Sequence, residues 1–161
     1  MRLGIVSDTH GHVLNALAAV RMLESLDVAA VLHCGDIGTP AIPPLFSAWP
    51  AHFVFGNCDY DEVELRGAIQ AAGLSCHDRF ADLTLGNRRI AVLHSDDARR
   101  FRATIESGEF DLVCYGHTHQ AESHQVGRTL VLNPGALYRA NPHTLAIVET
   151  ETLDVQIIPL S

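Results

Sequence analysis

The sequence predicts an α/β fold in which two mixed β-sheets pack face to face with helices on the outside. In the first half of the chain, short apolar runs alternate with helical patterns, and this alternation implies βαβ units with parallel strands. In the second half, short strands follow one another with turn residues between them. Hydrophobic residues make up 47% and charged residues 19% of the 161 residues, as in a globular protein with a sizeable core. We therefore expect a single domain over residues 1–161.

The first half is predicted to contain three strands, each followed by a helix. The strands span residues 3–6, 28–33 and 52–55, and the helices that follow them span residues 13–26, 40–49 and 62–72. Apolar side chains recur at helical spacing in the first helix. The second helix begins at a proline, and Gly73 ends the third.

The second half is predicted to be mostly strands. These span residues 81–85, 89–94, 111–115, 120–126, 129–132, 144–149 and 153–159, with one helix over residues 97–107. Gly86-Asn87 is a hairpin signal between the first two of them. The last four strands are joined by short turn segments, so we expect them to pair mainly antiparallel.

The charge balance argues against some classes of partner. The net charge is −8, and the dense basic clusters are limited to Arg88-Arg89 and residues 99–102, so generic nucleic-acid binding is disfavoured. An acidic protein can still bind phosphate where metal ions supply positive charge. No apolar run approaches the roughly 20 residues needed to span a bilayer. Because Met1-Arg2 leads directly into a core strand without a signal peptide, we expect a cytoplasmic protein with no membrane partner.

Potential metal ligands follow five of the predicted strands. They are Asp8, His10, Asp36, Asn57, His94, His117 and His119. Parallel neighbours place their carboxyl ends on one edge of a sheet, so these side chains should converge there. Seven ligands exceed one tetrahedral site but suit two metals that share a carboxylate. Mixed nitrogen and oxygen ligands favour Mn, Fe, Zn, Ni or Co over calcium.

Each of these residues also has a structural explanation when it is taken alone. Asp8 is suited to cap the following helix, Gly35-Asp36 and Gly56-Asn57 are suited to turns, and His94 to a hydrogen-bonded interior position. Their common placement at strand ends favours metal binding, and Gly116-His117-Thr118-His119 is the most specific segment. Structural roles are expected for the other six histidines, which are His12, His33, His52, His77, His124 and His143. His12 and His33 are the two of them placed to support the site.

Taken together, these motifs resemble the signature of a known family. The motifs are Asp8-x-His10, Gly35-Asp36, Gly56-Asn57-Cys58-Asp59, His94 and Gly116-His117-Thr118-His119. This set resembles the calcineurin-like metallophosphoesterase superfamily. The short chain and the late Asn133-Pro134-Gly135 are similar to its compact branch, which includes small microbial phosphodiesterases and the retromer's small subunit. The resemblance implies a four-layer αββα sandwich of two mixed sheets with a dinuclear site between them.

The resemblance also implies an activity and a role for each ligand. The activity is hydrolysis of phosphate esters, diesters ahead of monoesters, by a hydroxide that two metals activate, and Mn²⁺ is the metal implied for assay. One metal would be held by Asp8, His10, Asp36 and His119, and the other by Asp36, Asn57, His94 and His117. Asp36, Asn57 and His94 are the predicted catalytic residues. Supporting or substrate-contacting roles are predicted for Cys58, Asp59 and Asp96.

Two departures from the family pattern leave alternatives open. Many members have histidine at the position of Cys58, where it is proposed to protonate the leaving group, so the general acid is open here. Asp96 replaces a second histidine, and it either caps the helix that begins near Asp97 or faces the metal crevice. The expected partner is a small phosphate ester, and a homo-oligomer stays open. The alternative function is an interaction scaffold on the same fold, and a nuclease is disfavoured by the acidic balance.

Overall fold

The computed structural model describes residues 1–161 and consists of two β-sheets flanked by helices. The helices are α1 (Val13–Ser25), η1 (Pro43–Phe46), α2 (Glu62–Ala71) and α3 (Ala98–Glu106). The strands are β1 (Arg2–Val6), β2 (Ala30–His33), β3 (Ala51–Phe53), β4 (Ser75–Cys76), β5 (Phe80–Leu85), β6 (Arg88–Leu93), β7 (Leu112–Tyr115), β8 (Glu122–Val126), β9 (Thr129–Asn133), β10 (Thr144–Glu149) and β11 (Asp154–Pro159). One sheet has the order β11-β10-β1-β2-β3-β4, and the other has the order β5-β6-β7-β9-β8.

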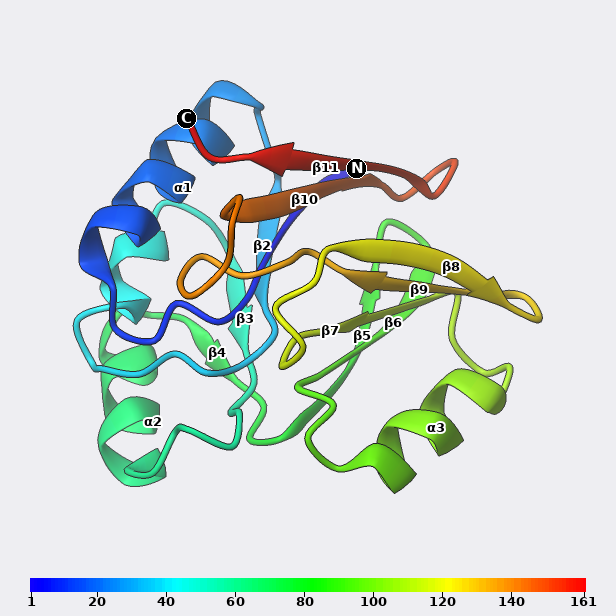
Figure 1. Ribbon diagram of the computed structural model, residues 1–161, viewed down its shortest axis with the longest axis horizontal. Helices are drawn as coiled ribbons and strands as arrows, with labels where there is room; N and C mark the ends of the chain where they lie inside the picture. The colour runs from blue at the N-terminus through cyan, green and yellow to red at the C-terminus, as the bar shows by residue number, and fades with distance from the viewer.

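Three apolar clusters separate four layers and confirm the predicted αββα arrangement. The first cluster packs α1, η1 and α2 against the six-stranded sheet. The second lies between the two sheets, and the third lies between the five-stranded sheet and α3. Figure 1 shows α1 and α2 on one side of the molecule and α3 on the other. None of the helices is both long enough and apolar enough to cross a membrane.

The buried strands have apolar side chains on both faces because both faces are covered. In β1, Leu3 and Ile5 point into the cluster between the sheets, whereas Val6 points toward the helices. Gly4 also faces α1, where an added Cβ would lie 2.5 Å from a methyl carbon of Leu23. A larger residue at this position would therefore force the Leu23 side chain of α1 to move.

The parallel half of each sheet orders the strand ends that carry the polar motifs. Strands β1, β2, β3 and β4 are parallel neighbours, and so are β6, β7 and β9. The antiparallel pairs are β1–β10, β10–β11, β5–β6 and β8–β9. Of the four strands expected to pair mainly antiparallel, β9 also has a parallel partner in β7.

Two elements differ from the expectation. The helix expected over residues 40–49 is a single 3₁₀ turn, η1, because Pro43 and Pro44 lack the N–H groups that a longer α-helix would need. Strand β4 was not expected, since two residues are too few to show a period. The Gly86-Asn87 hairpin is confirmed, with φ of +55° and +63°, the positive values that a type I′ turn requires at both positions.

Candidate metal centre

The seven predicted ligands lie in the loops that follow five strands at one edge of the molecule. Asp8 and His10 follow β1, Asp36 follows β2, Asn57 follows β3, His94 follows β6, and His117 and His119 follow β7. The first three strands belong to one sheet and the last two to the other. The two sheets therefore contribute ligands from opposite sides of the cluster.

Asp8 is at the centre of the first group of ligands. Its Oδ1 atom lies 3.1 Å from Nε2 of His119 and 3.7 Å from Nε2 of His10. The Nε2 atoms of these two histidines are 3.3 Å apart. The other carboxylate oxygen of Asp8 accepts hydrogen bonds from the Ser7 hydroxyl, at 2.6 Å, and from the His117 backbone N–H, at 3.2 Å. These hydrogen bonds leave Oδ1 facing the imidazoles.

Asp36 joins this group to the remaining ligands. Its Oδ2 atom lies 3.6 Å from Nε2 of His10 and 3.1 Å from Nε2 of His94. Its Oδ1 atom accepts a hydrogen bond of 2.8 Å from the Cys58 N–H. Since one carboxylate oxygen reaches imidazoles from both groups, the geometry suits the bridging position that the resemblance implies for Asp36.

Asn57 and His117 lie at the exposed rim of the cluster. Oδ1 of Asn57 is 3.1 Å from Nδ1 of His117, and the rings of His117 and His94 meet edge to face with centroids 5.1 Å apart. The structure thus brings all seven residues into one cluster. It also brings the thiol of Cys58 within 4.8 Å of ligand atoms of His10 and Asp36, so Cys58 is close enough to act as a further metal ligand.

Two buried polar atoms of the cluster have no hydrogen-bond partner. They are Oδ1 of Asp8 and Nε2 of His94. Leaving a buried polar atom unsatisfied costs about 1–3 kcal/mol, and more when the group is charged. A divalent cation accepts electron pairs from both kinds of atom and would compensate this cost. The donor set therefore fits a metal centre.

Backbone carbonyls orient two of the imidazoles toward the cluster. Nδ1 of His94 lies 2.8 Å from the Cys34 carbonyl, and Nδ1 of His119 lies 3.2 Å from the Arg139 carbonyl. A carbonyl oxygen can only accept, so both Nδ1 atoms donate, and the Nε2 atom of each ring carries a lone pair when that imidazole is neutral. This second contact is typical of metal-ligating histidines.

The backbone is strained at most of the predicted ligands. Five of the seven have a positive φ: Asp8, His10, Asp36, His117 and His119, with values between +45° and +81°. Such values cost free energy for residues that have a Cβ, and they cluster at functional sites. The strained loops direct the side chains inward. Such strain persists only where function or the surrounding packing enforces it.

Glycines beside the ligands allow the ligand side chains to pack closely against the backbone. Gly35 has a φ of +97°, and a Cβ there would lie 2.6 Å from Nδ1 of His94. Gly56 has no such φ, but its Cβ would lie 2.2 Å from Oδ1 of Asp36. The glycine at each of these positions therefore leaves the space that a ligand side chain occupies.

Burial and neighbouring charges act in opposite directions on the titration of the cluster. Burial raises the pKa of Asp36, but the nearby imidazole of His94, with Nε2 3.1 Å from Oδ2, and the Cys58 N–H outweigh burial and hold this pKa at about 2. Burial likewise raises the pKa of Asp8, and contacts with His10 and His94 lower it further than burial raises it. Both carboxylates are therefore ionised at neutral pH, as metal ligands must be.

Supporting residues hold the loops together. Asp59, predicted to support the site, accepts hydrogen bonds from the backbone N–H groups of Gly56, Ile37 and Gly38 and so ties the loop after β3 to the loop after β2. His33 is fully buried and lies 3.0 Å from the Thr9 hydroxyl, which donates to the Ile37 carbonyl. Sequence reasoning missed Thr9, because a hydroxyl between two ligands carries no spacing signal.

His12 has the structural role expected of the six remaining histidines. Its Nδ1 atom accepts a hydrogen bond of 3.3 Å from the Asn15 N–H, so it caps α1, and its ring stacks on Tyr138 with centroids 4.9 Å apart. It therefore borders the cluster without contacting a ligand through its polar atoms.

The capping role considered for Asp96 is wrong. The N-cap of α3 is Asp97, whose carboxylate accepts a hydrogen bond of 3.0 Å from the Arg100 N–H. The Asp96 carboxylate instead lies 3.8 Å from the guanidinium of Arg79 and lines a small hollow together with His94. Asp96 thus shares a hollow with one of the predicted ligands, His94.

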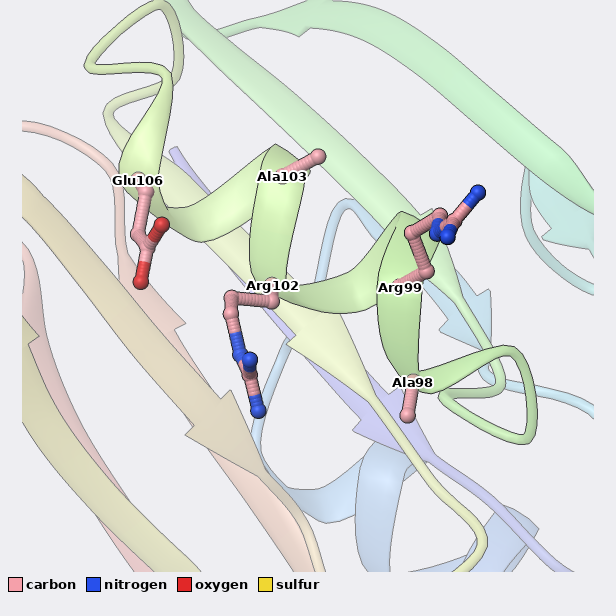
Figure 2. Close-up of a pocket in the computed structure, with 5 residues that line it drawn as sticks. All are labelled: Ala98, Arg99, Arg102, Ala103 and Glu106. Atoms are coloured by element: carbon pink, nitrogen blue, oxygen red, sulfur yellow. The ribbon is translucent and has the colours of Figure 1, made fainter.

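The densest basic segment, residues 99–102, lies in the first half of α3. Arg99 and Arg102 project from the outer face of α3 beside Glu106, where they line an open hollow of about 400 Å³ (Figure 2). Arg100 packs its guanidinium over the ring of Phe80. The hollow on α3 contains no residue of the candidate metal centre.

Comparisons with known proteins agree with this geometry. A family model described as the calcineurin-like phosphoesterase superfamily domain matches residues 1–153. The phosphodiesterase MJ0936 of Methanocaldococcus jannaschii is 29% identical over 165 residues, which cover 99% of both chains. The probable metallophosphoesterase YsnB of Bacillus subtilis is 29% identical over 144 residues, covering 85% of this chain and 75% of that one.

Two solved structures have a similar fold. An archaeal phosphodiesterase superposes with a TM-score of 0.92 at 28% identity, covering 99% of this chain and 100% of the other. Vps29 of Entamoeba histolytica, crystallised with Zn²⁺, superposes with a TM-score of 0.64 at 16% identity and full coverage of both chains. The second likeness is one of fold alone.

Proposed function

The chain belongs to the calcineurin-like phosphoesterase superfamily, and on that premise we propose that it is a metal-dependent hydrolase that cleaves phosphodiesters in preference to phosphomonoesters. The observation that carries this proposal is the cluster of carboxylates and imidazoles in which Oδ1 of Asp8 and Nε2 of His94 are buried without partners. The similarity to relatives named as phosphodiesterases supports diesters as the substrate class. We expect the substrate to be a small phosphate ester and the protein to act in the cytoplasm.

We propose that the seven residues hold two divalent cations, with Asp36 shared between them. Asp8, His10 and His119 would complete one site, and the other would be completed by Asn57, His94 and His117. Two such cations, when bound, lower the pKa of water and neutralise the negative charge that builds up on phosphorus during displacement. We propose manganese for assay, and the nitrogen and oxygen donors also suit iron, zinc, nickel and cobalt.

The residues of the chain contribute orientation and charge. The Cys34 and Arg139 carbonyls hold His94 and His119 with Nε2 inward, and Asp59 ties together the loops that carry Asp36 and Asn57. Preorganised groups of this kind need little rearrangement when charge develops at the reacting centre. The chain offers no histidine at position 58, so a leaving group with a low pKa, such as a phenolate, should be cleaved more readily than an alkoxide.

A second candidate function is an interaction scaffold, because the fold is shared with Vps29. A chain released from catalysis is free to lose metal ligands, whereas all seven predicted ligands are present and gathered in this protein. The retained cluster therefore favours the enzyme.

The test is a hydrolysis screen of phosphodiesters, phosphomonoesters and nucleotides with Mn²⁺, run against chelator-treated protein and the Asp36→Asn variant. We expect diester hydrolysis by the wild type that is lost on chelation and restored by metal. Asp36→Asn should abolish hydrolysis and leave the circular dichroism spectrum unchanged, since it removes a shared ligand and no core packing. Full activity of this variant at normal metal content would contradict a bridging role for Asp36.

A further inference from the structure

A second hollow opens next to the candidate metal centre. It has a volume of about 470 Å³, and its walls include His119, Gln120, Asn141, Pro142, Ile157 and Pro159. These residues come from the loop after β7, the segment before β10 and the edge strand β11. Apart from His119, none of them belongs to the predicted ligand set.

The lining is suited to an uncharged organic group. Ile157 is 38% exposed and presents an apolar surface to the hollow, and Pro142 and Pro159 extend the apolar wall. Gln120 and Asn141 offer side-chain amides, which both donate and accept hydrogen bonds. The lining contains no Lys, Arg, Asp or Glu, so it provides no counter-charge for a second anionic group. The volume falls in the range of small-molecule sites, about 300–1,000 Å³.

His119 connects this hollow to the reacting centre. Its Nε2 atom faces the cluster, 3.1 Å from Oδ1 of Asp8, and the same residue forms part of the wall of the hollow. His119 thus borders both the cluster, where a phosphate would bind, and the hollow that Ile157 and the two amides line.

We propose that this hollow binds the ester group that a phosphodiester retains after hydrolysis, an uncharged group about the size of a nucleoside. The inference rests on the proposed function. In the reaction, water forms a bond to phosphorus, the bond from phosphorus to the leaving oxygen breaks, and the retained group leaves as a phosphomonoester with release of a proton. A monoester has no such second group, so the hollow provides a physical reason for a preference for diesters.

The experiment compares three substrates that all release p-nitrophenolate. They are p-nitrophenyl thymidine 5′-phosphate, methyl p-nitrophenyl phosphate and p-nitrophenyl phosphate, which differ only in the second substituent on phosphorus. The variant Ile157→Trp fills the hollow. The matched control is Gln156→Trp, because the side chain of Gln156 points to the other face of β11 and lines a separate hollow with Arg2.

We expect wild type to prefer the thymidine diester over the methyl diester by about tenfold or more in kcat/KM, the size expected for an apolar group placed in a fitting pocket. Ile157→Trp should remove this preference, mainly through KM, and leave the methyl diester within about twofold. Gln156→Trp should behave as wild type. An equal effect of Ile157→Trp on all three substrates, or no effect on any, would overturn the proposal.

A binding measurement separates failure of this inference from failure of the proposed function. If wild type hydrolyses no diester, the proposed function fails. In that case, titration of thymidine 5′-phosphate into the Mn²⁺-loaded protein still tests the hollow. Weaker binding in Ile157→Trp than in Gln156→Trp would support it, and equal binding would overturn it.

Discussion

Asp96 and Asp97 are adjacent in the chain and perform different tasks. Asp97 caps α3, and Asp96 pairs with Arg79 and lines a hollow that His94 of the candidate metal centre also lines. An ionised carboxylate can accept but cannot donate a hydrogen bond, so Asp96 tends to repel a phosphate oxygen. Its ion pair with Arg79 is exposed, and such pairs contribute at most about 1 kcal/mol.

Asp96→His should raise the turnover of a simple phosphodiester at neutral pH, because an imidazole can donate a hydrogen bond or a proton to the bound phosphate. The melting temperature should change little. The measurement is kcat for bis(p-nitrophenyl) phosphate with Mn²⁺, with Asp96→Asn as the control that removes the charge but adds no imidazole. Unchanged turnover in Asp96→His would show that Asp96 has no influence on the substrate.

His33 gives a prediction on acid stability. Burial lowers the pKa of His33 to about 3, and in the unfolded chain its pKa is about 6.5. Between these values the unfolded state binds a proton that the folded state excludes, so His33 makes stability fall as the pH falls from 6.5 towards 3. The slope from one such group approaches about 1.4 kcal/mol per pH unit.

His33→Gln should therefore flatten the dependence of the free energy of unfolding on pH between 4 and 6.5. Urea denaturation at several pH values in chelator measures this slope, and the slopes are compared because the substitution also changes absolute stability. The exposed His124, replaced by Gln, is the control. Parallel curves for wild type and His33→Gln would contradict a buried neutral imidazole.

At the scale of elements, α3 depends on its cap more than α1 and α2 do. Its exposed face is strongly polar, and Thr104 is its one buried residue. It contacts the five-stranded sheet mainly through the partly buried Phe101 and Ile105. Local hydrogen bonding therefore supplies a large share of what keeps this helix folded.

Asp97→Ala should lower the free energy of unfolding by about 1 kcal/mol, because the first turn of α3 loses the carboxylate that accepts from the Arg100 N–H. Hydrolysis should be unchanged. Chemical denaturation and steady-state kinetics measure the two effects, with Asp96→Ala as the control for loss of a neighbouring charge. If Asp96→Ala proves as destabilising as Asp97→Ala, the cap is not the cause.

For the whole molecule, the gathered carboxylates and imidazoles couple metal binding to folding. The ligands come from both sheets, so the unfolded chain has no such cluster, and metal binds the folded state selectively. Without metal, the buried oxygen of Asp8 and nitrogen of His94 have no hydrogen-bond partner, and this lowers the free energy of unfolding of the metal-free protein.

Mn²⁺ at 100 times its dissociation constant should stabilise the protein by about 2.7 kcal/mol through mass action. The melting temperature, followed by calorimetry during a metal titration, is the readout. Asp36→Asn should show a much smaller shift, because it lacks the shared ligand. A melting temperature that does not respond to metal would contradict binding at this cluster.

The sequence by itself determined most of the elements and the edge at which the polar residues gather. The apolar period of α1, the Gly73 stop after α2 and the Gly86-Asn87 turn are local properties, and the structure reproduces them to within about a residue. Parallel strands end on a common edge, so residues placed directly after strands, such as Asp8 and Asp36, were expected to meet. The apolar periodicity did not predict the two-residue strand β4 or the 3₁₀ form of η1.

Only the tertiary structure decided which atoms meet. The contact between His10 and His119 joins residues 109 positions apart, and it depends on how the two sheets pack. The choice of Asp97 over Asp96 as the cap depends on where the backbone enters α3. The hollow beside His119 is completed by Ile157 of the edge strand, which no local pattern connects to the metal centre. Packing across layers sets these contacts, whereas spacing along the chain reports only on neighbours within one element.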